Sequence, residues 1–209
     1  MGKIDSDAGT LYIVSAPSGA GKTSLLKALL EDAKGIGLSI SHTTRDKRPG
    51  EQDGVHYHYV DVSTFEQMVA DGAFLEHAKV FDNYYGTSQA AVVAQLASGQ
   101  DVILEIDWQG AQQVRKHFPE AVGIFILPPS KTALRERLTD RGQDDSAIID
   151  RRMRDAEAEM SHYREFGFVV VNDDFEAALS ELRAIISSQR LAISRQQTRL
   201  RGLIKELLD

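Results

Sequence analysis

The sequence predicts an α/β fold in which helices cover both faces of a parallel sheet, a three-layer arrangement. Four apolar runs have the length and the β-branched content of buried strands, and they span residues 11–14, 102–106, 122–127 and 168–171. Helical patterns, with apolar residues three or four positions apart, span residues 23–33, 89–97, 112–118 and 132–139. Because strands and helices alternate, the strands are expected to run parallel to one another.

The chain is long enough for one domain of this kind. Its 209 residues, of which 42% are hydrophobic, supply one proper core but are too few for two domains. We therefore expect a single domain over residues 1–209, with a core formed by residues 10–38 and 92–209. Residues from about 39 to 91 combine an alternating pattern at 55–60, a helical pattern near 65–69 and an extended run at 74–81. They are predicted to form an insertion with a small mixed or antiparallel sheet.

Two further segments depart from the alternation of strand and helix. Residues 141–146 are polar, include Gly142 and join two arginine-bearing helical patterns, so we expect a mobile lid over about residues 137–153. From residue 175 onward, apolar residues at helical spacing predict one long helix or two stacked helices, packed against the sheet or against a second subunit. The basic residues beyond 187 are interpreted as a solvated helix face rather than an interface. A homo-oligomer is compatible with the sequence, which leaves the oligomeric state open.

Composition argues against several classes of protein. The chain has no cysteine, and therefore no disulfide framework and no thiolate metal site, which fits a reducing compartment. No apolar run approaches the roughly 20 residues that a membrane-spanning helix needs, and the polar start up to Gly9 lacks the apolar centre of a secretory signal. The formal net charge of -7 argues against nucleic-acid binding, which needs a basic surface. We therefore expect a cytoplasmic protein with neither a membrane nor a nucleic acid as partner.

One segment has the pattern and the position of a phosphate-binding loop. It follows the first apolar run, opens the first helical pattern and matches the Walker A motif, except that alanine stands at its first position. Its residues are Ala16, Pro17, Ser18, Gly19, Ala20, Gly21, Lys22 and Thr23. Gly19 and Gly21 allow backbone N–H groups to close around phosphate oxygens, and the helix N-terminus adds its positive dipole end. Lys22 is expected to reach the β- and γ-phosphates of a triphosphate, and Thr23 to bind Mg²⁺.

A triphosphate in this loop needs an acidic residue that helps to hold Mg²⁺, usually at the end of another buried strand. The apolar run at 102–106 includes Glu105 and is followed by Asp107. Either acid could instead face solvent at the end of a strand. With the phosphate-binding loop in the same sequence, Glu105 is favoured as the residue close to Mg²⁺.

Two function classes fit such a loop, a GTPase switch and a phosphotransferase. Residues 107–110 match the DxxG motif of GTPases, but the guanine-reading N-K-x-D motif is absent from the sequence. Two separate arginine clusters, at residues 45–48 and 135–154, fit a transfer between two anionic substrates, because their repelling charges must be neutralised. The sequence therefore favours a phosphotransferase.

Several motifs, in order along nearly the whole chain, resemble those of bacterial guanylate kinases. Besides the phosphate-binding loop, they are SHTTR at 41–45, RPGE at 48–51, DG at 53–54, FLE at 74–76, NYYGT at 83–87, DWQG at 107–110 and VNDD at 171–174. The resemblance implies a P-loop kinase that transfers the γ-phosphoryl group of ATP to GMP, with ATP as co-substrate and Mg²⁺ as cofactor. It also implies that the insertion is the GMP-binding region, and that this region and a helical lid close over the nucleotides.

The resemblance assigns roles to residues of the insertion. Guanidinium forks bind phosphate oxygens bidentately, and phenol hydroxyls donate single hydrogen bonds. The residues expected to hold the GMP phosphate are Arg45, Arg48, Tyr57 and Tyr85. Guanine presents two adjacent N–H donors beside its O6 acceptor, so a carboxylate and hydroxyl groups can select it. The residues expected to read the base are Glu76, Ser41 and Thr87, with Asp107 on the base or ribose side.

The resemblance also assigns roles to the lid. The catalytic residues that it implies are Lys22, Arg45, Arg137 and Arg152. Arg141 is expected to lie against adenine, with Asn172 and Asp173 near the same base. From the residues alone, the segment 172–174 would instead be interpreted as a strand-ending turn with a helix cap.

Two positions depart from the family's pattern. Glu105 stands where aspartate is expected, so its carboxylate reaches one methylene further. His77 replaces a frequent tryptophan, and we expect its side chain to pack rather than to take part in catalysis.

Two rival functions are weighed against the kinase. A peptide-binding scaffold module is opposed by the intact phosphate-binding loop, and a kinase of another small acceptor is opposed by Glu76.

Overall fold

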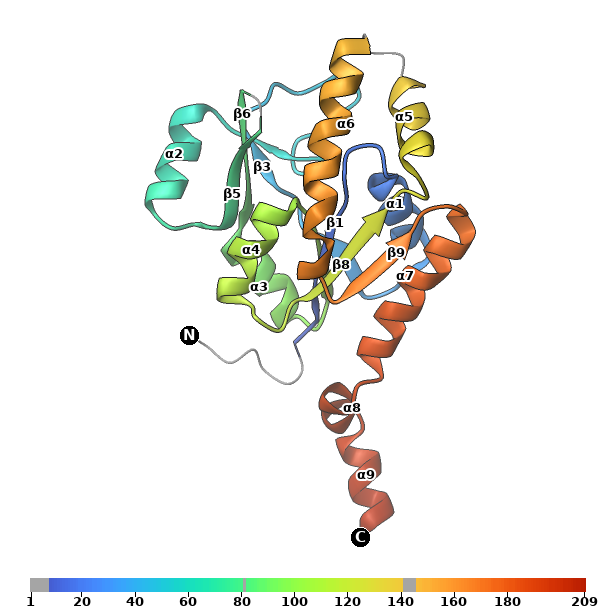
Figure 1. Ribbon diagram of the computed structural model, residues 1–209. Coiled ribbons are helices and arrows are strands. Elements are labelled where there is room, and N and C mark those ends of the chain that lie inside the picture. Colours follow the sequence, from blue (N-terminus) through green and yellow to red (C-terminus); the bar gives the residue numbers. More distant parts are fainter. Residues whose placement is uncertain (1–7, 81, 141–145) are drawn as a thin grey trace.

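The fold of the computed structural model, which describes residues 8–80, 82–140 and 146–209, is built on two sheets (Figure 1). The larger sheet is five-stranded and parallel, in the order β2-β7-β1-β8-β9. Its strands are β1 (Leu11–Ser15), β2 (Ile36–Leu38), β7 (Asp101–Glu105), β8 (Val122–Leu127) and β9 (Phe168–Val171). The four predicted strands are confirmed, and only β2 was missed, because its three residues are too few for a recognisable pattern.

Helices cover both faces of the larger sheet. Tyr12 and Ile13 are neighbours on β1, point to opposite faces as a strand requires, and are both fully buried. The apolar cluster around Tyr12 includes α1 (Lys22–Asp32) and α7 (Phe175–Arg190). The cluster around Ile13 includes α3 (Gln89–Ala97) and α4 (Trp108–His117). The predicted three-layer α/β arrangement is therefore confirmed.

The helix α4 begins earlier in the sequence than predicted. α4 starts at Trp108 rather than at residue 112, because Oδ1 of Asp107 accepts the N–H of Gly110 at 2.8 Å and caps the helix. Its first turn has few apolar residues and therefore did not show in the periodicity. None of the helices in the described residues combines the length and the apolar composition needed to cross a bilayer.

Residues of the expected insertion form the smaller sheet, with the order β4-β3-β6-β5. Its strands are β3 (His42–Thr43), β4 (His58–Tyr59), β5 (Phe74–Val80) and β6 (Asn83–Ser88). β3 and β4 pair in parallel, whereas the other pairs are antiparallel, so the mixed sheet is confirmed. The helix α2 (Val62–Ala70) packs on this sheet through Phe65, whose ring stacks on Phe74 with centroids 4.6 Å apart.

The strand suggested by the alternation at residues 55–60 is largely wrong. Only His58 and Tyr59 pair with β3. The preceding residues form a turn, in which Gly54 has a φ of 72° and the backbone N–H of His56 donates to the O of Gln52. Val55 is 59% exposed, so the alternation there does not correspond to a buried strand face.

The residues of the expected lid fall on α5 (Lys131–Thr139) and α6 (Ser146–Met160), and Arg141 lies outside the described residues. These helices share an apolar cluster of their own, formed by Leu134, Leu138, Ile149, Met153 and Ala156. Because this cluster is separate from the two clusters of the larger sheet, the helix pair is held together mainly by its own contacts.

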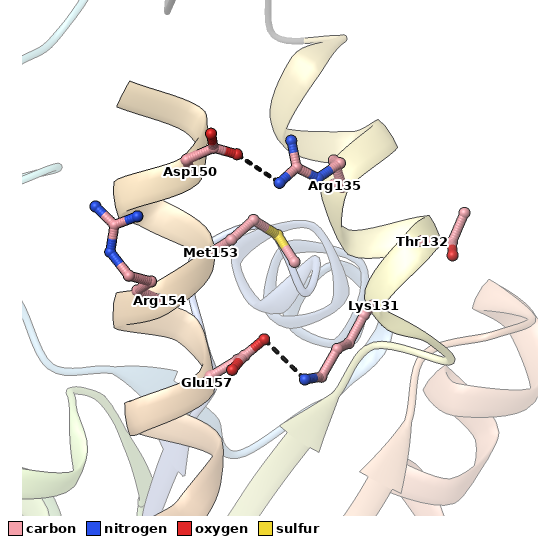
Figure 2. A pocket seen from close by; sticks show the side chains of 7 residues that line it. All are labelled: Lys131, Thr132, Arg135, Asp150, Met153, Arg154 and Glu157. Carbon is pink, nitrogen blue, oxygen red and sulfur yellow. Dashed lines mark hydrogen bonds and ion pairs between the residues drawn. The ribbon is translucent and has the colours of Figure 1, made fainter. Parts of the chain in front are cut away.

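A cavity of about 410 Å³ lies between α5 and α6, and Figure 2 shows the side chains that line it. Two ion pairs cross it: Nζ of Lys131 lies 2.8 Å from Oε1 of Glu157, and Nη2 of Arg135 lies 2.5 Å from Oδ1 of Asp150. All four side chains are substantially exposed, so each pair is expected to contribute about 1 kcal/mol or less.

One or two helices were predicted after β9, but the described residues there form three: α7, α8 (Ile193–Arg199) and α9 (Arg201–Leu208). The last two extend away from the sheets (Figure 1).

The basic residues after 187 were expected to form a solvated helix face, which is wrong for Arg190 and Arg195. Nε of Arg190 and Nη1 of Arg195 lie 2.8 and 2.7 Å from the carboxylate of Asp101. Asp101 is 1% exposed at the start of β7, and a buried carboxylate requires cationic partners.

Candidate functional site

The loop between β1 and α1 has the geometry of a phosphate cradle. Gly19 and Gly21 have φ of 93° and 91°, in the left-handed region that side chains rarely adopt. A Cβ at Gly21 would also lie only 2.3 Å from Nδ2 of Asn172. The N–H of Ala20 donates to the O of Pro17 at 3.1 Å and closes the loop. Because α1 begins directly after Gly21, its unpaired N–H groups point toward the space that the loop encloses.

Lys22, Thr23 and Glu105 meet at the carboxyl edge of the larger sheet. β1 and β7 are adjacent and parallel, with Val14 opposite Glu105, so the ends of these strands lie side by side. Oγ1 of Thr23 donates to Oε1 of Glu105 at 2.6 Å, and Nζ of Lys22 lies 3.9 Å from the same oxygen. Burial lowers the pKa of Lys22, and the nearby Glu105 opposes this shift.

Thr23 and Glu105 also fit a metal ion. A hydroxyl and a carboxylate are the hard oxygen ligands that Mg²⁺ prefers. In the part of the chain that the structure describes, no group of three or more His, Cys, Asp or Glu side chains could hold a metal ion alone. Mg²⁺ commonly takes one or two protein ligands and completes its shell with phosphate oxygens and water. The donor set therefore suits a metal ion that arrives with a triphosphate.

Two arginines of the expected lid contact the phosphate-binding loop or its neighbours. Nη2 of Arg152 on α6 donates to Oγ of Ser18 at 2.7 Å. Nη2 of Arg137 on α5 donates to the backbone O of Asn172 at 2.9 Å, and Nδ2 of Asn172 donates to the O of Ala20 at 2.7 Å. Asn172 therefore links the phosphate-binding loop to α5.

Residues 172–174, which directly follow β9, have different roles. Asn172 is 6% exposed and makes the link just described, whereas Asp173 is exposed. Oδ1 of Asp174 accepts the N–H of Ala177 at 2.8 Å and caps α7. The cap expected from the residues alone is thus present at Asp174, and it leaves the Asn172 side chain free for the phosphate-binding loop.

The Arg45 guanidinium already has acceptors in the chain itself: Nη1 donates to the backbone O of Asp46 at 2.6 Å, and Nη2 pairs with the carboxylate of Glu51. Nη2 of Arg45 lies 2.8 and 3.0 Å from the two carboxylate oxygens of Glu51. Glu51 also accepts the backbone N–H of Arg48 and the hydroxyl of Tyr59, each at 2.8 Å. The Arg45 guanidinium, more than the other donors, holds the pKa of Glu51 at about 2. The Arg48 side chain itself is exposed, so the structure brings it to this cluster only through its backbone.

Two tyrosines complete this side of the site. The guanidinium carbon of Arg45 lies 5.5 Å from the centroid of the Tyr57 ring, and the Tyr57 and Tyr85 centroids are 6.0 Å apart. Burial raises the pKa of Tyr57, and its hydroxyl is therefore a donor at neutral pH. Arg45, Glu51 and these tyrosines form what we call the phosphate clamp.

Glu76, Thr87 and Asp107 lie together between the smaller sheet and α4. Glu76 and Thr87 are opposite each other on β5 and β6, and Oγ1 of Thr87 donates to Oε1 of Glu76 at 2.5 Å. Glu76 is 5% exposed, and burial, with help from Asp107, raises its pKa to about 7 although Thr87 acts in the opposite direction. A Cβ on Gly110 would lie 3.1 Å from Oε2 of Glu76, so this carboxylate approaches the start of α4 closely. Ser41 precedes β3, where its backbone O accepts the N–H of His58.

Some contacts at the site could not be found from the sequence. Glu51 belongs to a motif, but no pattern indicated that its carboxylate pairs with Arg45. Trp108 stacks on His162 of the 3-10 helix η1 (Ser161–Glu165), with ring centroids 3.5 Å apart, and nothing in the sequence links positions so distant. His77 was expected to pack, but it is exposed on β5 and its ring lies 6.4 Å from that of Phe74.

Comparison with known proteins identifies close relatives over nearly the whole chain. A family profile described as guanylate kinase matches residues 8–189. A guanylate kinase from Chromohalobacter salexigens is 63% identical over 96% of this chain and 94% of its own length. One from Saccharophagus degradans is 60% identical over 96% and 98%. The crystal structure of guanylate kinase from Anaplasma phagocytophilum superimposes with a TM-score of 0.74 at 31% identity, covering 90% of this chain and 89% of that one.

Proposed function

The chain belongs to the guanylate kinase family and transfers the γ-phosphoryl group of ATP to GMP, and we propose that the two groups of residues described above bind these two substrates. The observation that carries the proposal is the buried Glu76, an acid that touches a hydroxyl beside the small sheet while the phosphate-binding loop lies elsewhere. Burial of an acid without a cationic partner destabilises the ligand-free protein, and such groups cluster at functional sites.

The cradle binds ATP in this proposal. The residues assigned to ATP are Ala16, Pro17, Ser18, Gly19, Ala20, Gly21, Lys22, Thr23, Arg141, Asn172 and Asp173. Support comes from the left-handed backbone at Gly19 and Gly21, directly before the start of α1, and from the link between Asn172 and Ala20. Thr23 and Glu105 would hold Mg²⁺, which screens phosphate charge when bound.

The insertion, over about residues 39–91, binds GMP. Arg45, Arg48, Tyr57 and Tyr85 take its phosphate, and the base is read by Glu76, Ser41 and Thr87 with Asp107 nearby. An ionised Glu76 accepts the two N–H groups of guanine, whereas adenine would leave that carboxylate unpaired in a buried place. The proposed core is 10–38 and 92–209, and the proposed lid is about 137–153.

Catalysis in this site is positioning and charge neutralisation. The GMP phosphate is largely dianionic near pH 7 because its second pKa is about 6, so no general base is required. Lys22, Arg137 and Arg152 would neutralise the transferring phosphoryl group, and Arg45 would hold the acceptor phosphate in line with it. Closure of the insertion and the lid over the substrates would exclude water that could hydrolyse ATP.

Separate binding measurements test the division into two sites. The binding of Mg²⁺-ADP and of GMP is measured by calorimetry for three variants, Lys22→Ala, Arg45→Ala and Arg183→Ala. The last is the control, because the guanidinium of Arg183 is exposed and pairs with Asp32. We expect Lys22→Ala to weaken ADP binding alone, Arg45→Ala to weaken GMP binding alone, and Arg183→Ala to change neither. Equal weakening of both ligands by either site variant would contradict the division.

The surroundings of the enzyme are proposed on composition. A chain without cysteine and with a net charge of -7 suits a reducing cytoplasm and does not suit a nucleic-acid partner. Its partners are then ATP and GMP, and a homo-oligomer is compatible with these features. Gel filtration with light scattering measures the oligomeric state directly.

A further inference from the structure

The smaller sheet ends at the strand that carries Glu76. β5 is the last strand in the order β4-β3-β6-β5, so β6 pairs with only one of its edges. On that edge Glu76 lies opposite Thr87, and His77 lies opposite Gly86. The backbone groups of β5 that point away from β6 need partners from another part of the chain or from water. The helix α4 lies beside this strand and can supply them (Figure 1).

Gln113 of α4 pairs with both backbone groups of His77, the residue after Glu76. Oε1 of Gln113 accepts the N–H of His77 at 3.2 Å, and Nε2 of Gln113 donates to the O of His77 at 3.2 Å. In an antiparallel sheet, two opposite residues exchange the same pair of hydrogen bonds. A side-chain amide carries both a donor and an acceptor, so one glutamine can replace a neighbouring strand at one position. Gln113 does so directly after Glu76.

Apolar contacts alone do not fix the position of β5 along α4. Leu75 of β5 joins the same apolar cluster as Ala111 of α4. Such burial sets how closely the strand and the helix approach, but it has no direction. The pairing of β5 with β6 changes register between Phe74 and Glu76, so the strand is irregular just before the carboxylate. The two hydrogen bonds of Gln113 are directional, and they hold β5 against α4 directly after this irregularity.

This position matters because the Glu76 carboxylate approaches α4 closely. A Cβ on Gly110 would lie 3.1 Å from Oε2 of Glu76. Gly110 and Gln113 are three positions apart on α4, so both lie on the side of the helix that faces β5. Consecutive residues of a strand are about 3.3 Å apart, and a shift of β5 by part of that distance would move the carboxylate relative to the start of α4.

We propose that Gln113 is a positioning residue for guanine recognition, which holds β5 in register with α4 so that Glu76 presents its carboxylate to the base. The inference rests on the role proposed for Glu76. The two bonds involve the backbone of His77, so the exposed side chain of His77 is not required for them. The neighbouring Gln112 differs, because its Nε2 donates to Oε2 of Glu165 on η1 at 2.9 Å and does not contact β5 through this bond.

Substitution of Gln113 tests the inference through specificity. Gln113→Met keeps the length of the side chain and removes its donor and its acceptor. We expect the ratio of kcat/KM for GMP to that for AMP to fall about tenfold, as for the loss of two neutral hydrogen bonds. The KM for GMP should rise, and the KM for ATP should stay within about twofold of the parent value. Gln112→Met is the matched control, because it also removes a hydrogen bond of α4, and its ratio should equal that of the parent.

A double substitution tests whether Gln113 acts through Glu76. In a Glu76→Gln background, Gln113→Met should cause no further loss of the ratio, because the carboxylate that Gln113 positions is gone. The inference is overturned if the losses multiply, or if Gln113→Met only lowers the thermal midpoint while the ratio and the KM for GMP stay unchanged. Should Gln113→Met fail to fold, Gln113→Ala carries the same comparison. An unchanged ratio in Glu76→Gln alone would instead contradict the proposed role of Glu76, so the two failures are distinguishable.

Discussion

The donor cradle and the acceptor insertion are built in different ways. The cradle rises from the middle of the larger sheet, where every residue of β1 is buried, and contacts between distant segments join its functional groups. The insertion rests on a sheet in which β3 and β4 have two residues each, and its polar side chains are satisfied by one another. The proposed cradle thus needs little rearrangement to receive an anion, whereas in the insertion a carboxylate already pairs with Nη2 of Arg45.

This difference has a consequence for binding. In the proposed binding mode, the GMP phosphate would have to share Arg45 with Glu51 or replace it, whereas the ATP phosphates would meet the N-terminus of α1, which has no side-chain cap. The insertion is therefore expected to rearrange on binding more than the cradle does. Each of the following changes acts on one region and should leave the other intact.

The largest effect is expected at the cradle. Lys22→Ala removes the cation proposed to contact the β- and γ-phosphates, and kcat should fall about 10³-fold, as when other preorganised charge-stabilising groups are removed. The dissociation constant of GMP should change by less than about threefold. A coupled assay of ADP release gives kcat, and calorimetry gives the GMP affinity. Near-normal turnover would remove Lys22 from the mechanism.

The phosphate clamp should respond through KM rather than kcat. Arg45→Lys keeps the charge but loses the planar guanidinium, which can bind phosphate bidentately. The KM for GMP should therefore rise about 10- to 100-fold, which corresponds to the loss of one or two charged hydrogen bonds. The KM for ATP should not change. Lys47→Ala, an exposed residue of the same segment, serves as the control. If both KM values rose together in Arg45→Lys, the clamp would not be specific to the acceptor.

A smaller effect is expected at the proposed metal site. Glu105→Gln keeps the hydrogen-bond acceptor for Thr23 but loses the charge, so the Mg²⁺ concentration for half-maximal rate should rise about tenfold. Saturating Mg²⁺ should restore most of the rate. Kinetics over a Mg²⁺ series give this value, and an unchanged Mg²⁺ dependence would show that Glu105 is not near the ion.

The smallest effect concerns stability and pH in the ligand-free protein. Burial raises the pKa of Glu76 from 4.5 to about 7, so the folded state binds this proton more tightly than the unfolded state. Ionisation of Glu76 therefore lowers stability as the pH rises from about 4.5 to about 7. The glutamine in Glu76→Gln cannot ionise. The melting temperature of this variant minus that of the parent should therefore be larger at pH 8 than at pH 5. Each kcal/mol of difference in the free energy of unfolding corresponds to about 2 to 4 °C. Thermal scans at both pH values test this, and an equal difference at the two would contradict the buried charge.

The larger sheet was predictable because its strands are buried on both faces and appear as continuous apolar runs, as at Val122–Leu127. The smaller sheet was predictable only in outline. Its alternation at 55–60 reflects a turn around Gly54, where backbone hydrogen bonds rather than burial decide the conformation. The break between α8 and α9 leaves no mark in the apolar spacing.

The candidate site shows a similar division. The phosphate-binding loop could be predicted because glycines and a lysine at fixed spacing express its chemistry locally. The pairing of Arg45 with Glu51, and the hydrogen bond from Thr23 to Glu105, depend on how separate segments pack, and no local pattern encodes them. For the same reason, burial of Glu76 could be known only once β5, β6 and α4 were placed together.

If the Glu76 carboxylate reads guanine, as proposed, its substitution must change the ratio of kcat/KM for GMP to that for AMP. The ratio is measured at pH 8 for the parent protein, for Glu76→Gln and for Glu66→Gln, an exposed glutamate of α2 that serves as the control. Glu76→Gln should lower the ratio by at least about 100-fold, because its amide cannot accept both guanine N–H groups. Glu66→Gln should leave it unchanged. A ratio in Glu76→Gln equal to that of the parent protein would contradict this proposed role of Glu76.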